Sequence, residues 1–234
     1  MKVLCSSSSH LSYHLWDGRL LGPSSSAVAL TGDKWALSDH LRAQGVQTPV
    51  CYAVDEIPTQ FPLVCKPRFG AGSQATFLIE QPEALQDCLA VARTEGWHGE
   101  MILQPFVAGT AASVAFLCGP DYCMPLLPAA QQLSNDGRFH YRGGELSLRS
   151  PLAERAVRVA RSAVDAVPGL KGYVGVDLVL GDAGDWVIEV NPRLTTSFLG
   201  LRMLAEDNLA ELMVRVALGE VVKAPRWRDE IVRF

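Results

Sequence analysis

Short apolar runs alternate with amphipathic stretches along most of the chain, and the two patterns predict a mixture of strands and helices. Runs rich in Val, Ile, Leu and Phe are typical of buried strands, whereas apolar positions three and four residues apart are typical of helices. Because the predicted antiparallel strands are grouped with helices, the fold class predicted is α+β. Strands are predicted at residues 50–54, 63–66, 75–79, 101–107, 113–118, 126–131, 173–180 and 186–193, and helices at 33–44, 82–94, 151–166 and 206–218.

Capping residues support several of these ends. Thr31 is a plausible N-cap for the first helix, and Ser150 with Pro151 suits the start of the third. Asn135-Asp136-Gly137 predicts a turn. Residues 1–30 carry two serine clusters with little periodicity, so they predict an irregular lead-in or the remnant of an N-terminal domain.

The two apolar runs near the C-terminus predict a β-hairpin around a Gly- and Asp-rich turn. If Leu180 faces Trp186, then Asp177 lies opposite Glu189, and Asn191 shares their face. Facing carboxylates repel each other, and burial raises that cost. A hard divalent cation such as Mg²⁺ relieves the conflict. The hairpin therefore predicts a metal site, and the alternative is a solvated edge hairpin with incidental acidic residues.

Composition narrows the classes of protein that fit. The 234 residues are 48% apolar and 20% charged, which is ordinary for a globular protein. A net charge of −4 argues against binding nucleic acid or an anionic membrane surface. No apolar run approaches the roughly 20 residues of a membrane span, and the N-terminus does not resemble a secretory signal. Six cysteines without CxxC spacing predict buried free thiols in the cytoplasm, with neither disulfides nor zinc.

A glycine-rich segment between two predicted strands is a candidate phosphate loop. Gly70 and Gly72 allow close backbone approach, and Ser73 adds a donor. Such a loop alone is a weak signal, but Lys66 precedes it at the end of an apolar strand. Lys34, in the first turn of the first predicted helix, would be a second cation for a polyphosphate.

Taken together and in this order, the motifs resemble the ATP-grasp superfamily. The resemblance implies ATP held between the antiparallel sheets of two α+β subdomains. It divides the chain into a lead-in at 1–30, a lid subdomain at 31–107 and a catalytic, metal-binding subdomain at 108–234. The motifs are Asp33-Lys34, Val64–Ser73, Leu103–Gly109, Gly175–Asp177 and Ile188–Arg193.

The resemblance also implies roles for individual residues. ATP with Mg²⁺ or Mn²⁺ would be the cofactors, and catalysis would depend on Arg193 and Lys66. Arg193 would stabilise the transferring phosphate, which suits a guanidinium. The residues implied to bind ATP are Lys34, Lys66, Gly70, Gly72, Ser73, Gln104, Pro105, Phe106 and Val107, and those implied to bind metal are Asp177, Glu189 and Asn191.

Within the superfamily, three short stretches look most like the tyramine–glutamate ligase group: residues 21–25, 141–144 and 191–197. That resemblance implies an ATP-dependent ligase that activates a carboxylate as an acyl phosphate and joins it to an amine. Glutamate and an aromatic amine, in one-carbon cofactor biosynthesis, are the substrates it suggests. Arg142, Gly143 and Gly144 could line the acceptor side, with Thr195 and Thr196 nearby; a plain turn at 143–144 is the alternative.

The chain departs from the family pattern in two ways. Pro105 stands where members usually have an acidic residue, and only 33 residues precede Lys34, where most members have a whole N-terminal domain. A homodimer or a partner subunit could complete the cleft around the small-molecule substrates. An ATP-binding module or incomplete enzyme without independent turnover therefore stays open as the alternative to a complete ligase.

Overall fold

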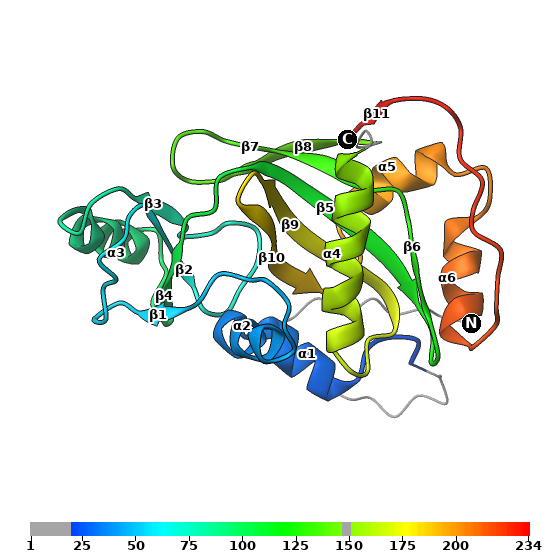
Figure 1. Cartoon of the computed structure of the whole chain (residues 1–234), viewed down its shortest axis with the longest axis horizontal. Helices are drawn as coiled ribbons and strands as arrows, with labels where there is room; N and C mark the ends of the chain where they lie inside the picture. The colour runs from blue at the N-terminus through cyan, green and yellow to red at the C-terminus, as the bar shows by residue number, and fades with distance from the viewer. Residues whose placement is uncertain (1–19, 147–150) are drawn as a thin grey trace.

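The computed structural model describes residues 20–146 and 151–234, which form two antiparallel sheets with helices packed around them (Figure 1). Every strand pairing in these residues is antiparallel, so the α+β class is confirmed. The predictions for residues 1–19 and for Ser150 lie outside the described residues. None of the described helices has the length and apolar character needed to cross a membrane.

The small sheet has the strand order β1–β4–β2–β3 and carries helix α3. Its core joins Leu63 and Cys65 of β2 and Leu103 of β4 to Leu85 of α3. In Figure 1 this sheet and α3 lie at the left-hand end of the molecule, far from α6. The bounds are β1 Tyr52–Ala53, β2 Leu63–Pro67, β3 Phe77–Ile79, β4 Met101–Pro105 and α3 Ala84–Thr94.

The large sheet has the strand order β10–β9–β5–β7–β8–β11, with β6 paired to β5. Helix α4 packs on β9, β10 and β5. The strands are β5 Thr110–Cys118, β6 Cys123–Pro125, β7 Ala129–Leu133, β8 Tyr141–Leu146, β9 Gly172–Gly181, β10 Gly184–Asn191 and β11 Val232–Arg233; the helices are α1 Ser25–Gly32, α2 Lys34–Ala43, α4 Leu152–Ala166, α5 Ser197–Leu204 and α6 Leu209–Ala217.

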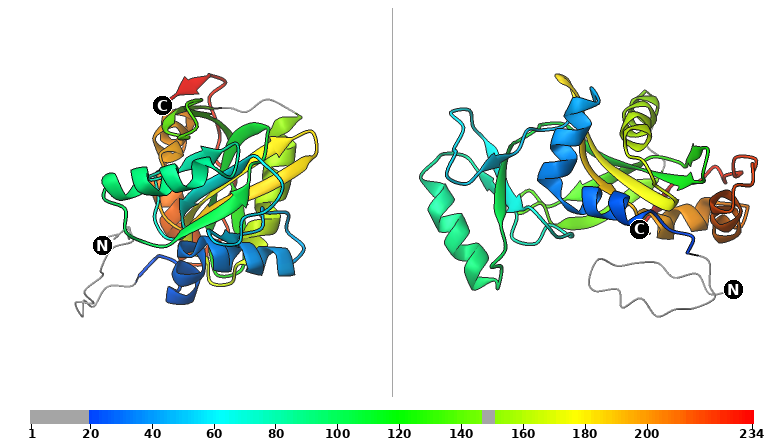
Figure 2. Two further views of the ribbon diagram at one scale, coloured as in Figure 1. Left: turned by 90° about the vertical axis from the view of Figure 1, so that its left-hand side faces the viewer. Right: turned by 90° about the horizontal axis from the view of Figure 1, so that it is seen from below.

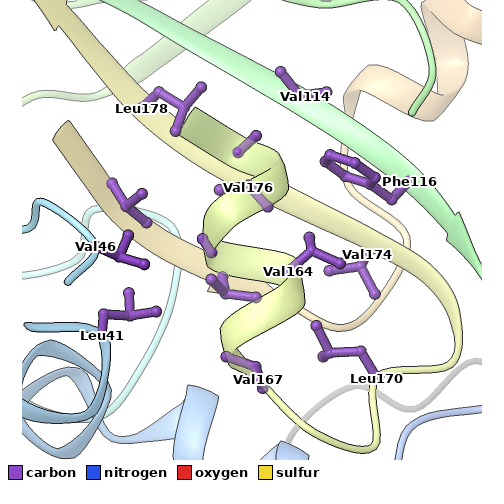
Figure 3. Packing of buried hydrophobic residues seen from close by; sticks show 14 of the residues in the cluster. Leu41, Val46, Val114, Phe116, Val164, Val167, Leu170, Val174, Val176 and Leu178 are labelled. Carbon is purple, nitrogen blue, oxygen red and sulfur yellow. The ribbon is translucent and has the colours of Figure 1, made fainter. Parts of the chain in front are cut away.

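Alternation along β5 and β9 separates two faces of the large sheet. Even-numbered residues such as Val114, Phe116 and Val176 pack under α4, as Figure 3 shows. Odd-numbered residues face the other way, where α5 and α6 cover Leu117 and Tyr173. The second view of Figure 2 places α4 and α6 on opposite sides of the sheet. Toward the start of β5 and the end of β9, odd-numbered residues such as Ser113 and Asp177 lie on the side of the large sheet that faces the small sheet.

The first helices differ from the sequence prediction. Residues 25–30, predicted to be irregular, belong to α1, and the Ser24 side chain caps this helix by accepting from Ala27 N. Thr31 is not an N-cap: it lies inside α1 and its hydroxyl donates to the Ala27 carbonyl. Asp33 caps α2 instead, because its carboxylate accepts from two backbone N–H groups of the first turn. Asp is a stronger N-cap than Thr, and its negative charge also interacts favourably with the helix N-terminus.

Several further features differ from the sequence prediction. Strand β8 and helix α5 were not anticipated, and the last predicted helix begins later, at Leu209, after its cap Asn208. The absence of disulfides was also predicted wrongly, since Cys118 and Cys123 are bonded. The two cysteines are opposed across the β5–β6 hairpin, a pairing that depends on the turn between them rather than on CxxC spacing.

Candidate active site

The two sheets enclose a cleft of about 1160 Å³. Every residue that the resemblance implies to be catalytic or to bind ATP or metal lines this cleft, although these residues come from different elements far apart in the chain. One wall supplies lysines and the glycine loop, and the other supplies the carboxylates. The roles themselves stay predictions. The residues are Lys34, Lys66, Gly70, Gly72, Ser73, Gln104, Pro105, Phe106, Val107, Asp177, Glu189, Asn191 and Arg193.

A β-bulge in β10 places the carboxylates opposite each other. Near the turn Leu180 pairs with Asp185 rather than with Trp186, so the predicted register was wrong there. The register shifts by one between Val187 and Glu189, and beyond it Glu189 pairs with Asp177 as predicted. The extra residue changes which side chains face the core. Without it, Glu189 would point toward α4 instead of the cleft.

Asp177 lies in a charge conflict that its neighbours only partly relieve. Its two oxygens accept from Gln131 Nε2 at 2.8 Å and from Asn191 Nδ2 at 2.9 Å. Burial, reinforced by the facing Glu189 carboxylate, nevertheless raises the pKa of Asp177 to about 7. The geometry therefore disfavours two bare carboxylates at this point.

This set of donors fits a divalent cation. Two carboxylates and an amide are hard oxygen ligands of the kind that Mg²⁺ and Mn²⁺ accept. The raised pKa of Asp177 marks a negative site that a cation would stabilise. Asn191 carries both a donor and an acceptor, so it suits the site with or without a cation. Among the described residues no cluster of three His, Cys, Asp or Glu occurs, and the third oxygen here is an amide.

The two lysines approach the carboxylates from the opposite wall. Lys34 Nζ lies 3.3 Å from Glu189 Oε1 and donates to the Gly70 carbonyl at 2.7 Å. Lys66 is only 8% exposed, and burial lowers its pKa to about 8, an effect that Glu189 opposes and Lys34 reinforces. Glu189 carries one negative charge beside these two cations. A polyphosphate in the cleft would supply further negative charge.

The glycine loop follows β2 and bends over the same wall. Gly70 and Gly72 have φ of 121° and 77°, and Ser73 has φ of 56°. Glycine adopts these conformations without strain, whereas Ser73 does so at some cost. Below the loop, a Cβ on Gly70 would come within 3.3 Å of the Trp97 ring. The loop is thus shaped by backbone conformation and by close packing.

Residues 104–107 line the far end of the cleft. Gln104 Nε2 donates to the Pro49 carbonyl, and the Phe106 N–H donates to the Pro62 carbonyl, so this N–H is already paired. Pro105 has no N–H to donate. Although Phe106 is implied to bind ATP, its backbone N–H is therefore not available for that role unless the Pro62 contact breaks.

Arg193 and the residues after it form the third side. Arg193 Nη2 donates to Asn191 Oδ1 at 2.9 Å, and Thr195 and Thr196 line the cleft as predicted. The prediction for 142–144 was wrong, because Gly143 and Gly144 lie in β8 rather than in a turn or on the cleft wall, and Gly144 pairs with the C-terminal Phe234. A register shift in the β7–β8 pairing sets Tyr141 opposite Leu133, and both residues line the cleft.

Comparison with known proteins agrees with this geometry. The ATP-grasp domain family matches residues 31–197, which is most of the chain. The chain belongs to the ATP-grasp family. Its tyramine–L-glutamate ligase relative from Methanocaldococcus fervens is 28% identical over 204 residues, covering 86% of this chain and 57% of that protein. A D-alanine–D-alanine ligase from Francisella philomiragia is 26% identical, covering 80% of this chain and 66% of that protein.

The fold is shared more widely. The biotin carboxylase from Campylobacter jejuni, solved as a β-γ-ATP complex, superposes with a TM-score of 0.75 at 18% identity over 89% of this chain and 51% of that one. The resemblance inferred from the motifs is confirmed by these matches. The chain spans little more than half the length of the tyramine–L-glutamate ligase it matches.

Proposed function

We propose that this chain is an ATP-dependent carboxylate–amine ligase. The observation that carries the proposal is the meeting of two lysines and a glycine loop with Asp177, Glu189 and Asn191 across one cleft of an ATP-grasp fold. Phosphoryl transfer depends mainly on positioning and on neutralising charge, and this cleft offers both. The named activities of its ligase relatives support the same chemistry.

The chain's residues would divide the work as follows. Lys34 and Lys66 bind the phosphates, and the loop at 70–73 excludes water above them. A substrate carboxylate oxygen attacks the γ-phosphorus, the bond to the bridging oxygen breaks, and ADP leaves. The amine then attacks the acyl carbon of the acyl phosphate, expels inorganic phosphate and gives up a proton to solvent. Arg193 stabilises the transferring phosphoryl oxygens. A divalent ion held by Asp177, Glu189 and Asn191 supplies charge neutralisation.

The finer assignments belong to the same proposal. We propose Mg²⁺ or Mn²⁺ as the metal, the cytoplasm as the compartment, and glutamate with an aromatic amine in cofactor biosynthesis as substrates. The last point follows the named activity of the tyramine–L-glutamate ligase relative. We also propose residues 31–107 as the lid subdomain and 108–234 as the catalytic subdomain, with a second copy or a partner chain able to complete the cleft.

ADP release with Mg-ATP, measured over a panel of acids and amines, tests the proposal. We expect release that requires both an acid and an amine, together with an amide product detected by mass spectrometry. Glu189→Gln should abolish it, because the substitution removes one metal-binding charge. ATP binding without ADP release for any pair would instead support an ATP-binding module. Release from other pairs but not from glutamate with an aromatic amine would remove only the substrate assignment.

A further inference from the structure

Gln131 is a polar residue of the cleft to which none of the sequence motifs assigns a role. It lies in β7, and β5 separates it from Asp177 in β9. Its Nε2 nevertheless donates a hydrogen bond of 2.8 Å to Asp177 Oδ1. Its side chain therefore reaches across a whole strand to contact one carboxylate of the metal site.

Small residues in β5 make this reach possible. Ser113 pairs with Asp177 on one side and with Ala129 on the other, so these three residues share a face of the sheet. Gln131 is two residues beyond Ala129 and lies on the same face, beside Ala111. The methyl of Ala111 and the hydroxymethyl of Ser113 leave room for the long amide side chain above β5.

The Gln131–Asp177 hydrogen bond matters because Asp177 is one of the residues proposed to bind the metal. Asn191 donates to the other oxygen, so both oxygens of this carboxylate are held. Donors that hold a ligating carboxylate fix its orientation and favour its charged form, and their removal commonly costs metal affinity. An amide is suited to this position because it donates without carrying a charge that would compete with the cation.

We propose that Gln131 is a positioning residue that holds Asp177 in the orientation that binds a divalent cation together with ATP. The inference rests on the proposed function, because it concerns the metal site of that reaction. Gln131 contacts neither the phosphates nor the reacting atoms in this role. Its effect reaches the reaction only through Asp177.

The test compares Gln131→Met with Gln132→Met, the latter at the adjacent, exposed position. Met keeps the length of the side chain and removes its donor. Binding of Mn²⁺ in the presence of ATP would be followed by electron paramagnetic resonance, and ATP binding without divalent cations by calorimetry. We expect Gln131→Met to weaken Mn²⁺ binding by about 10- to 100-fold and to leave metal-free ATP binding unchanged. Gln132→Met should match the parent in both measurements.

A variant with a shorter side chain distinguishes loss of the hydrogen bond from misfolding. Gln131→Asn keeps the amide but cannot span β5, so it should lose Mn²⁺ affinity as Met does while its thermal unfolding stays near that of the parent. Parent-like Mn²⁺ binding by either variant would overturn the positioning role alone. Equal losses of ATP affinity with and without metal would also overturn it, since they indicate general damage. If the parent itself failed to bind Mn²⁺ with ATP, the proposed function would fall as well.

Discussion

The two walls of the cleft are built differently. The large sheet has helices on both faces along much of its length, with α4 on one face and α5 and α6 on the other. The small sheet has α3 on one side and the cleft on the other. The large sheet presents oxygen ligands, whereas the small sheet and α2 present cations and a glycine loop. The carboxylates of the large sheet repel one another, as do the lysines on the opposite wall, so a metal-bound polyphosphate would relieve both conflicts.

Several contacts join the walls, and Leu37 and Leu41 of α2 also pack into the core of the large sheet. Lys34 and Glu189 form an ion pair across the cleft. The β7–β8 turn also reaches the small sheet, where the Gly137 carbonyl accepts from Leu78 N at 2.7 Å and Arg138 bonds Glu95 at 2.8 Å. A sheet with one covered face is expected to move more easily than one packed on both faces.

The largest expected effect comes from the large-sheet wall. Arg193→Lys keeps the charge but loses the planar fork that can hold a phosphoryl group and Asn191 together. We expect ADP release to fall by about 100-fold or more, with ATP binding close to that of the parent. Steady-state kinetics combined with calorimetry separate the two effects. A loss confined to ATP affinity would place Arg193 in ground-state binding instead.

Lys66→Met tests the opposite wall. ATP affinity should fall by about 100-fold, because a buried cation facing the phosphates is lost. The ligand-free protein should become more stable by about 1 to 3 kcal/mol, since burial lowers the pKa of Lys66 to about 8. Between pH 8 and the usual lysine pKa of 10.5 the unfolded chain binds more protons, so the penalty shrinks as pH rises. Thermal unfolding should therefore show the two proteins converging above pH 8.

How much of this could be read from the sequence differs between the two sheets. The Asp177–Glu189 pairing was correct even though the register at the turn was wrong, because a bulge restores it. Val187 and Val190 are both buried although three residues apart, and strict alternation cannot place both in the core. That spacing was the available signal for the bulge.

Contacts that depend on strand order could not be predicted from the sequence. The Gln131–Asp177 bond needs β5 between β7 and β9, an arrangement that no local pattern encodes. The helix at Ser25–Gly32 was missed for a different reason. Its residues show no amphipathic period, and Ser24 was counted as part of a serine cluster rather than as a cap. The lysines and glycine loop were found because their order along the chain is itself the signal.

Arg138→Met should weaken the contact between the β7–β8 turn and the small sheet. The substitution removes the bond to Glu95 and another to the Thr76 carbonyl, while Met still covers the Phe77 ring. Because these contacts are partly exposed, we expect a loss of about 1 kcal/mol, or roughly a fivefold faster release of a fluorescent ATP analogue in stopped-flow. Arg142→Met, at an exposed position of β8, is the matched control. Equal release rates for both variants would show that the Arg138 contacts do not restrain the small sheet.

The smallest effect on the cleft is expected at the far end of the large sheet. Cys118 lies five residues beyond Ser113 along β5, roughly 17 Å from the strand position opposite Asp177. Cys118→Ser with Cys123→Ser removes the disulfide, which closes only a short loop, so unfolding should become easier by about 2 kcal/mol or less. ATP affinity should not change, since both faces of the intervening sheet are packed. ATP affinity would be measured by calorimetry for the double variant and for the parent with its disulfide reduced. A lowered ATP affinity in the double variant would mean that the large sheet transmits strain to its metal ligands. The sheet would then be less rigid than its two helical layers imply.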